Sequence, residues 1–517
     1  GAGLRGNAGV APRVSEVRPE GEATWRRWVD ASRLVKDLPG RTQPLTNLAE
    51  AEPALFDAAT NAVKGIVATD GGVPGCQTAE LSSPRPEIMR RVTALAERPI
   101  LPPSIFRSNK PVRIVQVDLA KEDLGGVVSS GDWPSGTLFV ASGAGMRKSS
   151  PIRVRGISIR IEFRQTQGQP LQIEPRAVNA RTAEREGLLS DALMSVDEGG
   201  RIEIAHARIR FLNSKSVPSP KWLLVARDGS FLFEDCIVLG PVIGNSRTEG
   251  LIRWERPPSA SVQSMDAGRY EQYGEIRNSY FNGSGKLLDL EIAGRALIVS
   301  NSVLARSGNL FEFNIRGDGP LIHGAVHIVN STLSAKREFF KILADPRNQP
   351  TERPLQLLVK HTVFAPPVGG ATQNRPVLLT YKEAAARTER QMQWWGQANG
   401  YSHLLRKYLE GPAETRGRAE RFETGWGNAW QTVACLRPLH GRGVVALKKQ
   451  LPTATRLTPA DFALHPSSKA VRWTVDGKAI GANLNTLANI GPKTSIAAPR
   501  PAADKARKTN KPRKANF

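Results

Sequence analysis

The sequence is poor in cysteine and has no long apolar run, and each absence excludes a class of protein. Its 517 residues include three cysteines and no Cys-x-x-Cys pair. A disulfide scaffold, a zinc knuckle and a dithiol redox centre are therefore excluded. No apolar run reaches the roughly 18 residues that a membrane-spanning helix needs, so no transmembrane segment is expected.

Several catalytic motifs are also absent. The sequence has no Gly-x-Ser-x-Gly elbow and no kinase motifs, that is, no nucleotide loop with its strand lysine, no His-Arg-Asp and no Asp-Phe-Gly. His323 and His327 are four residues apart, but on one strand this spacing separates them by about 13 Å, too far for one metal ion. We expect no kinase activity in this chain, no serine hydrolase chemistry, no zinc site and no cofactor.

Positive charge, in contrast, is in excess. The chain has 72 Lys and Arg against 48 Asp and Glu, a formal net charge of +24 and a pI of about 10.3. Such a surplus attracts polyanions such as acidic polysaccharides, cell-wall polymers or nucleic acid, although a merely solvated charge stays an alternative. The basic C-terminus has no aromatic residue except Phe517, so nucleic acid would be bound by charge alone.

Glycine (47) and proline (37) favour many turns over long helices. We expect residues 1–110 to form a mixed, partly helical N-terminal region or cap, and residues 111–380 to form short strands. Residues 381–497 are expected to be a terminal coil, cap and insertions. Residues 498–517 have too few apolar side chains to fold, which predicts a disordered basic tail. Because the chain begins with Gly1 rather than Met, we expect a processed form or a fragment.

A repeated unit is present in the strand-rich part. Six segments share a polar residue with alternating apolar residues on both sides, and these residues are His206, Asp235, Asn278, Asn301, Asn330 and His361. Period-two alternation before and after each of them predicts two strands that meet at a corner. The corners are 29, 43, 23, 29 and 31 residues apart, which is one solenoid coil each, with a loop insertion between Leu239 and Tyr273.

The corner residues and their neighbours fit a stacked architecture. Asn and Asp tolerate the left-handed backbone of a one-residue corner, and their side chains can bond the same residue about 4.8 Å away in the next coil. The residue after the corner is small and faces inward, which makes Cys236 inert packing. With one more apolar strand per coil, the pattern predicts an all-β chain, a right-handed parallel β-helix of about seven or eight coils.

The strand–Asn-Ser–strand units resemble right-handed β-helix proteins related to pectate lyases and polygalacturonases. The segments Gln393–Tyr401, Phe462–Ser468 and Val475–Ala482 look like the terminal coil and cap of such chains. More narrowly, the chain is similar to uncharacterised bacterial β-helix regions, some of them C-terminal to a Ser/Thr kinase domain. The resemblance covers about Val112 to Leu487 and implies a fold and a cell-envelope or extracellular location. The Asp-Asp and Gly-His-Gly motifs of polygalacturonases are absent, which disfavours a hydrolase.

One outward row of side chains is a candidate active site. Alternation places Asp289, Glu312 and Lys341 outward on successive coils, about 5 Å apart. Two carboxylates at that distance repel by about 3 kcal/mol at an effective dielectric of about 20, so one could act as a general acid and the other as a base or nucleophile. The alternatives are a solvated face neutralised by Lys341 and a calcium site made of the same carboxylates.

Further residues are candidates for ligand binding. They are Glu291, Asn314, Arg316, Trp394, Trp395 and Tyr401. The aromatic residues could stack on sugars or close the open end of the solenoid. We expect a non-catalytic module that binds carbohydrate or polyanionic polymers, as part of an envelope or signalling protein. The alternatives are a polysaccharide lyase or hydrolase that uses the Asp289 row, and a scaffold or sensory region of a Ser/Thr kinase.

Overall fold

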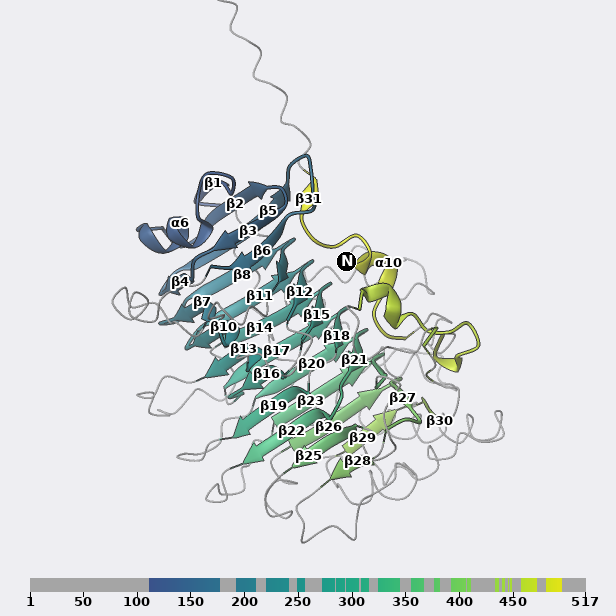
Figure 1. The fold of residues 1–517 in the computed structure, drawn as a ribbon. Coiled ribbons are helices and arrows are strands. Elements are labelled where there is room, and N and C mark those ends of the chain that lie inside the picture. The colour runs from purple at the N-terminus through teal and green to yellow at the C-terminus, as the bar shows by residue number, and fades with distance from the viewer. Residues whose placement is uncertain are drawn as a thin grey trace, which may run out of the picture.

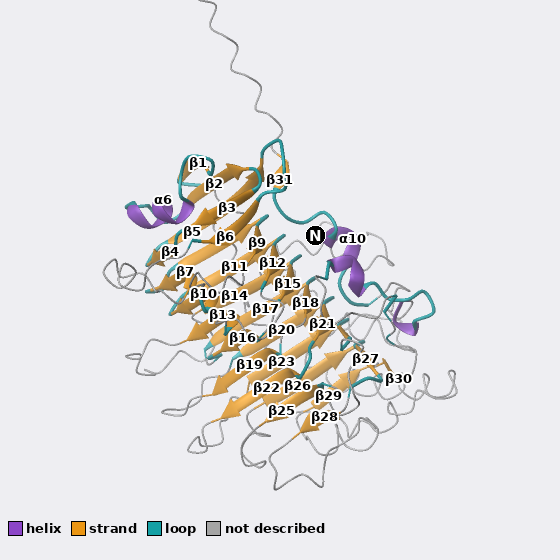
Figure 2. Cartoon of the chain, viewed as in Figure 1, coloured by secondary structure: helices purple, strands orange, loops and turns teal. Residues whose placement is uncertain are grey.

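The computed structural model describes most of the strand-rich part of the chain. The described residues are 111–176, 192–210, 220–240, 249–255, 272–283, 285–292, 294–305, 308–315, 324–344, 355–366, 376–381, 392–405, 407–410, 433–436, 439–441, 445, 447–448, 457–471 and 480–494. The predicted N-terminal region, 1–110, and the predicted basic tail, 498–517, lie outside them. Strands dominate the described part, with few helical turns (Figure 2). None of its helices is long and apolar enough to span a membrane.

The strands form three sheets in which all neighbours are parallel (Figure 1). Sheet A runs through β1 (Arg113–Asp118), β2 (Thr137–Gly143), β5 (Ser158–Gln165), β8 (Arg201–Ala205), β11 (Ser230–Glu234), β14 (Gln272–Arg277), β17 (Arg295–Ser300), β20 (Ala325–Val329), β23 (Leu355–Lys360), β26 (Met392–Gln397) and β29 (Val433–Leu436), with β31 (Lys493–Thr494) beside β5. Sheet B runs through β3 (Met146–Ser149), β6 (Gln172–Pro175), β9 (Arg208–Arg210), β12 (Ile237–Leu239), β15 (Tyr280–Asn282), β18 (Val303–Ala305), β21 (Thr332–Ser334), β24 (Val363–Phe364), β27 (Gly400–Ser402) and β30 (Leu439–Gly441). Sheet C runs through β4 (Ile152–Arg155), β7 (Ala192–Asp197), β10 (Trp222–Arg227), β13 (Gly250–Glu255), β16 (Lys286–Leu290), β19 (Asn309–Ile315), β22 (Glu338–Ala344), β25 (Val377–Tyr381) and β28 (Lys407–Glu410).

From β2 to β28 each coil contributes one strand to each sheet, so the predicted parallel β-helix is confirmed. Sheet C has nine strands, close to the seven or eight coils expected. Two corners outside the six aligned segments have other residues: β2 and β3 are joined through Gly145 (φ 69°), and a later corner lies at Ala398 (φ 48°). The stretch between Leu239 and Tyr273, predicted as a loop, contains strand β13.

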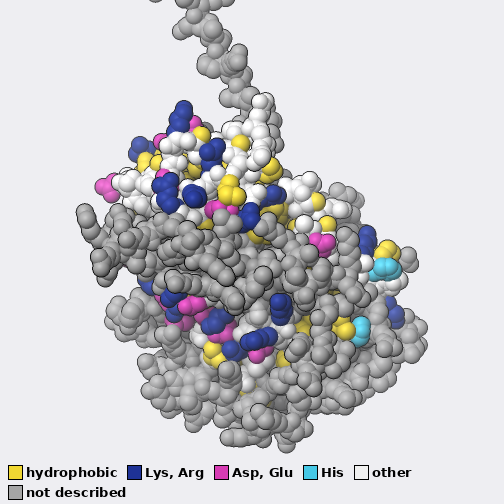
Figure 3. Space-filling view, in the orientation of Figure 1, with side chains coloured by type: hydrophobic (Ala, Val, Ile, Leu, Met, Phe, Trp, Pro, Cys, Tyr) yellow, Lys and Arg dark blue, Asp and Glu magenta, His cyan; other side chains and the backbone are white. Residues whose placement is uncertain are grey.

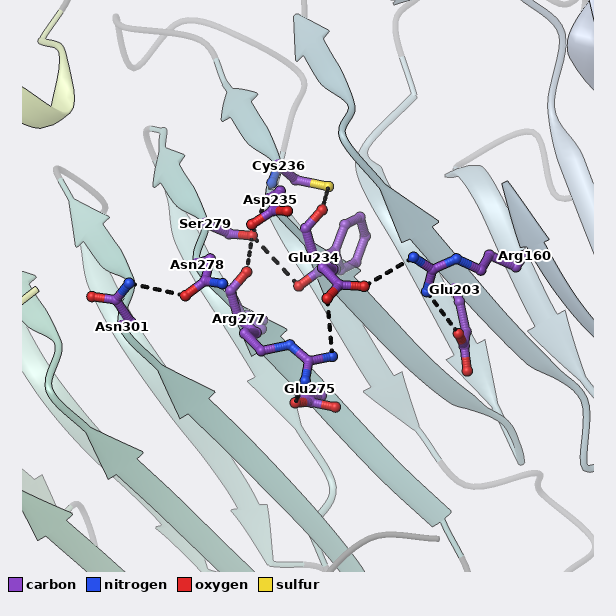
Figure 4. Close-up of polar contacts among 12 residues, drawn as sticks. Arg160, Glu203, Glu234, Asp235, Cys236, Glu275, Arg277, Asn278, Ser279 and Asn301 are labelled. Carbon is purple, nitrogen blue, oxygen red and sulfur yellow. Dashed lines mark hydrogen bonds and ion pairs between the residues drawn. The ribbon is translucent and has the colours of Figure 1, made fainter. Parts of the chain in front are cut away.

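All six predicted corners adopt the left-handed backbone that the repeat required. Their φ values lie between 43° and 58°. Asn301 Nδ2 donates to Asn278 Oδ1 in the preceding coil at 2.9 Å, so this step of the expected amide ladder is present. The ladder of the following residue is more regular, since Ser279 Oγ accepts from Cys236 N at 3.1 Å (Figure 4). One coil later, Ser302 Oγ accepts from Ser279 N at 3.1 Å. The small residues are therefore required for their hydroxyl groups as well as for their size.

The N-terminal end of the solenoid is covered by helix α6 (Leu124–Ser130), which packs against β3 and β4. Its apolar face buries Leu124 and Val128. Gly125 allows the close approach, because a Cβ atom there would lie 2.0 Å from the carbonyl oxygen of Ser150. The solenoid core thus ends against a helix rather than against water.

A C-terminal segment covers the outer face of sheet B. It includes the short helical turns η3 (Pro459–Phe462), η4 (Lys469–Val471) and α10 (Leu484–Leu487). Phe462 and Leu487 pack on outward residues of sheet B such as Tyr280 and Val303. Residues 480–494, the C-terminal strap, then run back along the corners to β31, and Asn483 N donates to Asn301 Oδ1 at 2.6 Å (Figure 1). Part of the predicted terminal cap therefore lies along the side of the solenoid.

Candidate ligand-binding face

The predicted outward row is formed on sheet C. Asp289 pairs in register with Glu312, and Glu312 with Lys341. The row continues to Arg253 on one side and Thr380 on the other. Alternation along the strands was sufficient to place these side chains side by side on strands β16, β19 and β22.

Lys286 and Asn309 also contact the row, because of the way in which the sheet C strands begin. Most of them start with two successive apolar residues that both belong to the central core: Leu193-Met194, Leu223-Leu224, Leu251-Ile252, Leu287-Leu288, Leu310-Phe311, Phe339-Phe340 and Leu378-Leu379. Such a pair interrupts the alternation. The residue before it, for example Lys286 or Asn309, therefore reaches the outer face, where both contact the row. The repeated apolar pair is the sequence signal that could have revealed this.

Glu312 is held by three donors. Its Oε1 lies 2.5 Å from Lys286 Nζ, and its Oε2 lies 3.0 Å from Lys341 Nζ and 3.1 Å from Asn309 Nδ2. Burial raises the pKa of this carboxyl, but the two lysines outweigh burial and leave the pKa below its usual value. At neutral pH Glu312 is a fixed carboxylate that has no proton to give.

Lys286 also neutralises the second carboxylate. Its Nζ lies 3.2 Å from Asp289 Oδ2, and Asn314 donates to Asp289 Oδ1. The pKa of Lys286 is raised, because its contacts with Glu312 and Asp289 outweigh the burial that opposes its charge. The expected repulsion between the two carboxylates is therefore relieved by a cation between them. That ammonium group also lies where the predicted calcium ion would bind, and among the described residues no group of three or more His, Cys, Asp or Glu could hold a metal ion.

The other predicted ligand-binding residues are distributed differently. Glu291 is buried, and its backbone oxygen accepts from Arg295 at 2.7 Å. Arg316 lies outside the described residues, as does the side chain of Trp395, whose backbone pairs with Leu358.

Trp394 and Tyr401 do not offer rings to a ligand, which corrects the prediction. They are 0% and 1% exposed. Trp394 is in register with the core residue Leu357, and Tyr401 stacks on Phe364 with ring centroids 5.0 Å apart. Both occupy inward positions of the repeat, and β29 and β30 continue the solenoid beyond them.

The N-terminal half of the same face contains arginine clusters that the sequence reasoning missed. Glu255 accepts from two of them, with Arg227 Nε at 2.5 Å from Oε1 and Arg253 Nε at 2.8 Å from Oε2. One coil earlier, Arg153 Nε lies 3.5 Å from Asp197 Oδ2. Burial raises the pKa of Asp197, partly offset by nearby arginines including Arg227.

Four basic side chains of this face lie nearer the solvent than its acidic ones, whereas Lys341 and Arg153 are only 13% and 18% exposed. The side chains of Arg155, Arg227, Arg253 and Lys286 are 50%, 37%, 37% and 37% exposed. Those of Asp197, Glu255, Asp289 and Glu312 are 13%, 15%, 10% and 2% exposed. Acidic side chains are well exposed only at the rims, as at Glu198 in the turn after β7. The strands thus present positive charge to a ligand, and Figure 3 shows Lys and Arg side chains beside Asp and Glu ones.

The outer face of sheet A has a second ion network, and it is closed. Arg160 contacts Glu203 and Glu234 at 3.1 and 3.0 Å (Figure 4). It also contacts Glu162 at 3.0 Å. These carboxylates raise the pKa of the guanidinium although burial opposes its charge. The Glu203 side chain is 0% exposed and that of Arg160 is 10% exposed. This network can fix the coils to one another but offers little surface to a ligand.

Comparison of the chain with protein-family models gave no match, and a search among curated proteins gave none either. The structure therefore shows a parallel β-helix architecture, and these comparisons add no family to it. Function has to be argued from the faces of the solenoid.

Proposed function

We propose that the protein is a non-catalytic β-helix module that binds an anionic polysaccharide along the outer face of sheet C. The observation that supports this most is the difference in depth between charges, with bases such as Arg227 and Lys286 about a third exposed above nearly buried acids. A polymer that approaches this face meets guanidinium and ammonium groups first, and these attract carboxylate or sulfate groups.

The repeat of the face suits a polymer better than a small molecule. Adjacent coils of a parallel sheet lie about 4.8 Å apart, so polar side chains recur at that interval along the solenoid axis. Arg227, Arg253 and Lys286 lie on three successive sheet C strands, β10, β13 and β16. A chain of sugars with regularly spaced charges can contact several of them at once, and linked contacts add affinity without extra ordering cost for each unit.

The surroundings of the predicted row on sheet C argue against glycoside hydrolysis there. Glycoside hydrolysis requires one protonated carboxyl group near neutral pH. Glu312 has a lowered pKa and is surrounded by three donors, and Asp289 is bonded to Lys286 and Asn314. The contacts of Glu312 stabilise its charged form, so it does not supply this acid. An envelope or extracellular location, expected from the resemblance, is where such polymers occur.

The test is binding of polygalacturonate to the full-length protein, with uncharged dextran as the matched polymer. We expect saturable binding of polygalacturonate that weakens as salt is raised, and no binding of dextran. After long incubation neither unsaturated nor reducing-end products should accumulate. Equal binding of both polymers would remove the electrostatic basis of the proposal, and product release would show that the protein is an enzyme.

A further inference from the structure

We propose that Glu255 is a positioning residue that holds Arg227 and Arg253 as a fork for one oxyanion group of the bound polymer. The inference rests on the proposed function and adds to it a defined subsite. The residues come from two neighbouring coils: Arg227 and Glu255 are partners in register on β10 and β13, and Arg253 precedes Glu255 by two residues on the same side of β13.

The geometry leaves the outer ends of both arginines available. Glu255 engages each of them through Nε, at 2.5 Å and 2.8 Å. A guanidinium has five N–H donors in a rigid fork, so this contact still leaves the terminal nitrogens of Arg227 and Arg253 with donors to offer. Both side chains are 37% exposed, whereas the Glu255 side chain is 15% exposed. The carboxylate lies at the base of the site and the donors lie at its mouth.

A second contact fixes Arg253. Its guanidinium lies 5.9 Å from the centre of the Trp222 ring, within the range of a cation–π interaction. Trp222 in turn lies across Gly250, where a Cβ atom would be only 2.2 Å from the ring, so glycine is needed there. Trp222 is 2% exposed and thus supports the arginine rather than a sugar. Such preorganisation reduces the side-chain entropy that binding would otherwise lose.

The positioning role makes a prediction opposite in sign to that of simple electrostatics. If Glu255 were only a negative charge near the ligand, its removal would strengthen binding of a polyanion. If Glu255 aligns two guanidinium groups, its removal weakens binding although the face becomes more positive. Arg227 and Arg253 contact different oxygens of Glu255, and Gln replaces one of these oxygens by an NH₂ donor, so one of the two Nε groups loses its acceptor.

The experiment measures the dissociation constant of the full-length protein for polygalacturonate and, separately, for dextran sulfate. We expect Glu255→Gln to weaken binding about fivefold, and Glu255→Asp, which keeps the carboxylate, to recover part of the loss. The matched control is Glu198→Gln, which removes an equal charge from the rim of the same face, where Glu198 pairs with Arg155 at 3.7 Å; it should bind as tightly as the wild type or more tightly. In an Arg227→Ala/Arg253→Ala background, Glu255→Gln should no longer weaken binding, a change of sign that a merely structural role would not produce.

The outcomes separate the two proposals. The polymer that shows this pattern identifies the bound group as carboxylate or sulfate. If the wild type binds and Glu255→Gln binds equally or more tightly for both polymers, the fork is wrong while the binding function stands. If the wild type binds neither polymer, the proposed function fails and the fork fails with it.

Discussion

The outer faces of sheets A and C both consist of parallel strands with charged side chains, but they differ in how deeply these side chains are buried. On sheet A, Arg160 and Glu203 are 10% and 0% exposed, and the ion network is closed. On sheet C, Arg253 is 37% exposed above Glu255, which is 15% exposed. Burial of both partners gives a structural link between coils, whereas burial of the acid alone gives a surface with an outward positive charge. The depth of the base relative to the acid therefore distinguishes scaffold from binding face.

The largest expected effect is on the closed face. Arg160→Met should lower the free energy of unfolding by about 3–5 kcal/mol, because it removes the cation that links Glu162, Glu203 and Glu234 and leaves the buried Glu203 with Arg201 as its remaining ion-pair partner. Denaturant titration measures it. The matched variant on the open face is Arg227→Met, and equal losses for the two variants would contradict the difference between the faces.

A smaller effect is expected at Glu312, which is buried but lies on the open face. Glu312→Gln should lower the free energy of unfolding by about 1–3 kcal/mol, since Lys286 and Lys341 lose the carboxylate that they share. Asp461→Asn, in the exposed turn before Phe462, is a control for loss of one carboxylate. A variant as stable as the wild type would show that the lysines find other partners at no cost.

Stability should also fall in acid because of Glu312. Its pKa in the folded protein lies below the usual value of 4.5, so the unfolded chain takes up the proton first as the pH falls. The contribution of this carboxylate is complete above the unfolded pKa and is lost as the pH falls through the folded one. Urea titrations across this range should show a steeper loss for the wild type than for Glu312→Gln. Parallel curves would mean that Glu312 does not titrate differently in the two states.

The smallest effect on stability is expected for the exposed base Arg253. Arg253→Ala should change the free energy of unfolding by less than about 1 kcal/mol, because half-exposed ion pairs contribute little. The same variant should bind polygalacturonate several-fold more weakly, whereas Arg164→Ala on sheet A, which is 48% exposed, should not. A large loss of stability in Arg253→Ala would assign this arginine to the scaffold.

The sequence was sufficient for the repeat because its corners are chemically distinctive. Asn278 and Asn301 adopt positive φ, and asparagine is a residue type that tolerates this backbone, so these corners can be recognised in the sequence. Period-two alternation then determines which residues point outward. Corners at Gly145 and Ala398 lack that chemistry, so the pattern of corner residues alone does not locate them. Trp394 was assigned to a ligand because an aromatic residue is equally suited to a sugar and to a core.

Only some residues of the candidate site could be predicted from the sequence. The row of Asp289, Glu312 and Lys341 follows from alternation alone, but Lys286 reaches it through the interrupted alternation at the start of its strand. The pair of Arg227 and Glu255 was missed because β13 lies in a stretch that varies in length between coils. How deeply a charged side chain is buried depends on its length and on the side chains of the neighbouring coils. The sequence of one strand alone therefore does not reveal which charges are covered.

The most direct test compares the affinity for polygalacturonate of the wild type and the Arg227→Ala/Arg253→Ala variant, both full length and both folded. If the outer face of sheet C is the binding surface, the variant should bind at least about tenfold more weakly while its unfolding free energy changes little. Arg164→Ala measures the effect of charge removed elsewhere. Unchanged affinity in the double variant would contradict the account and would place polyanion binding outside this face.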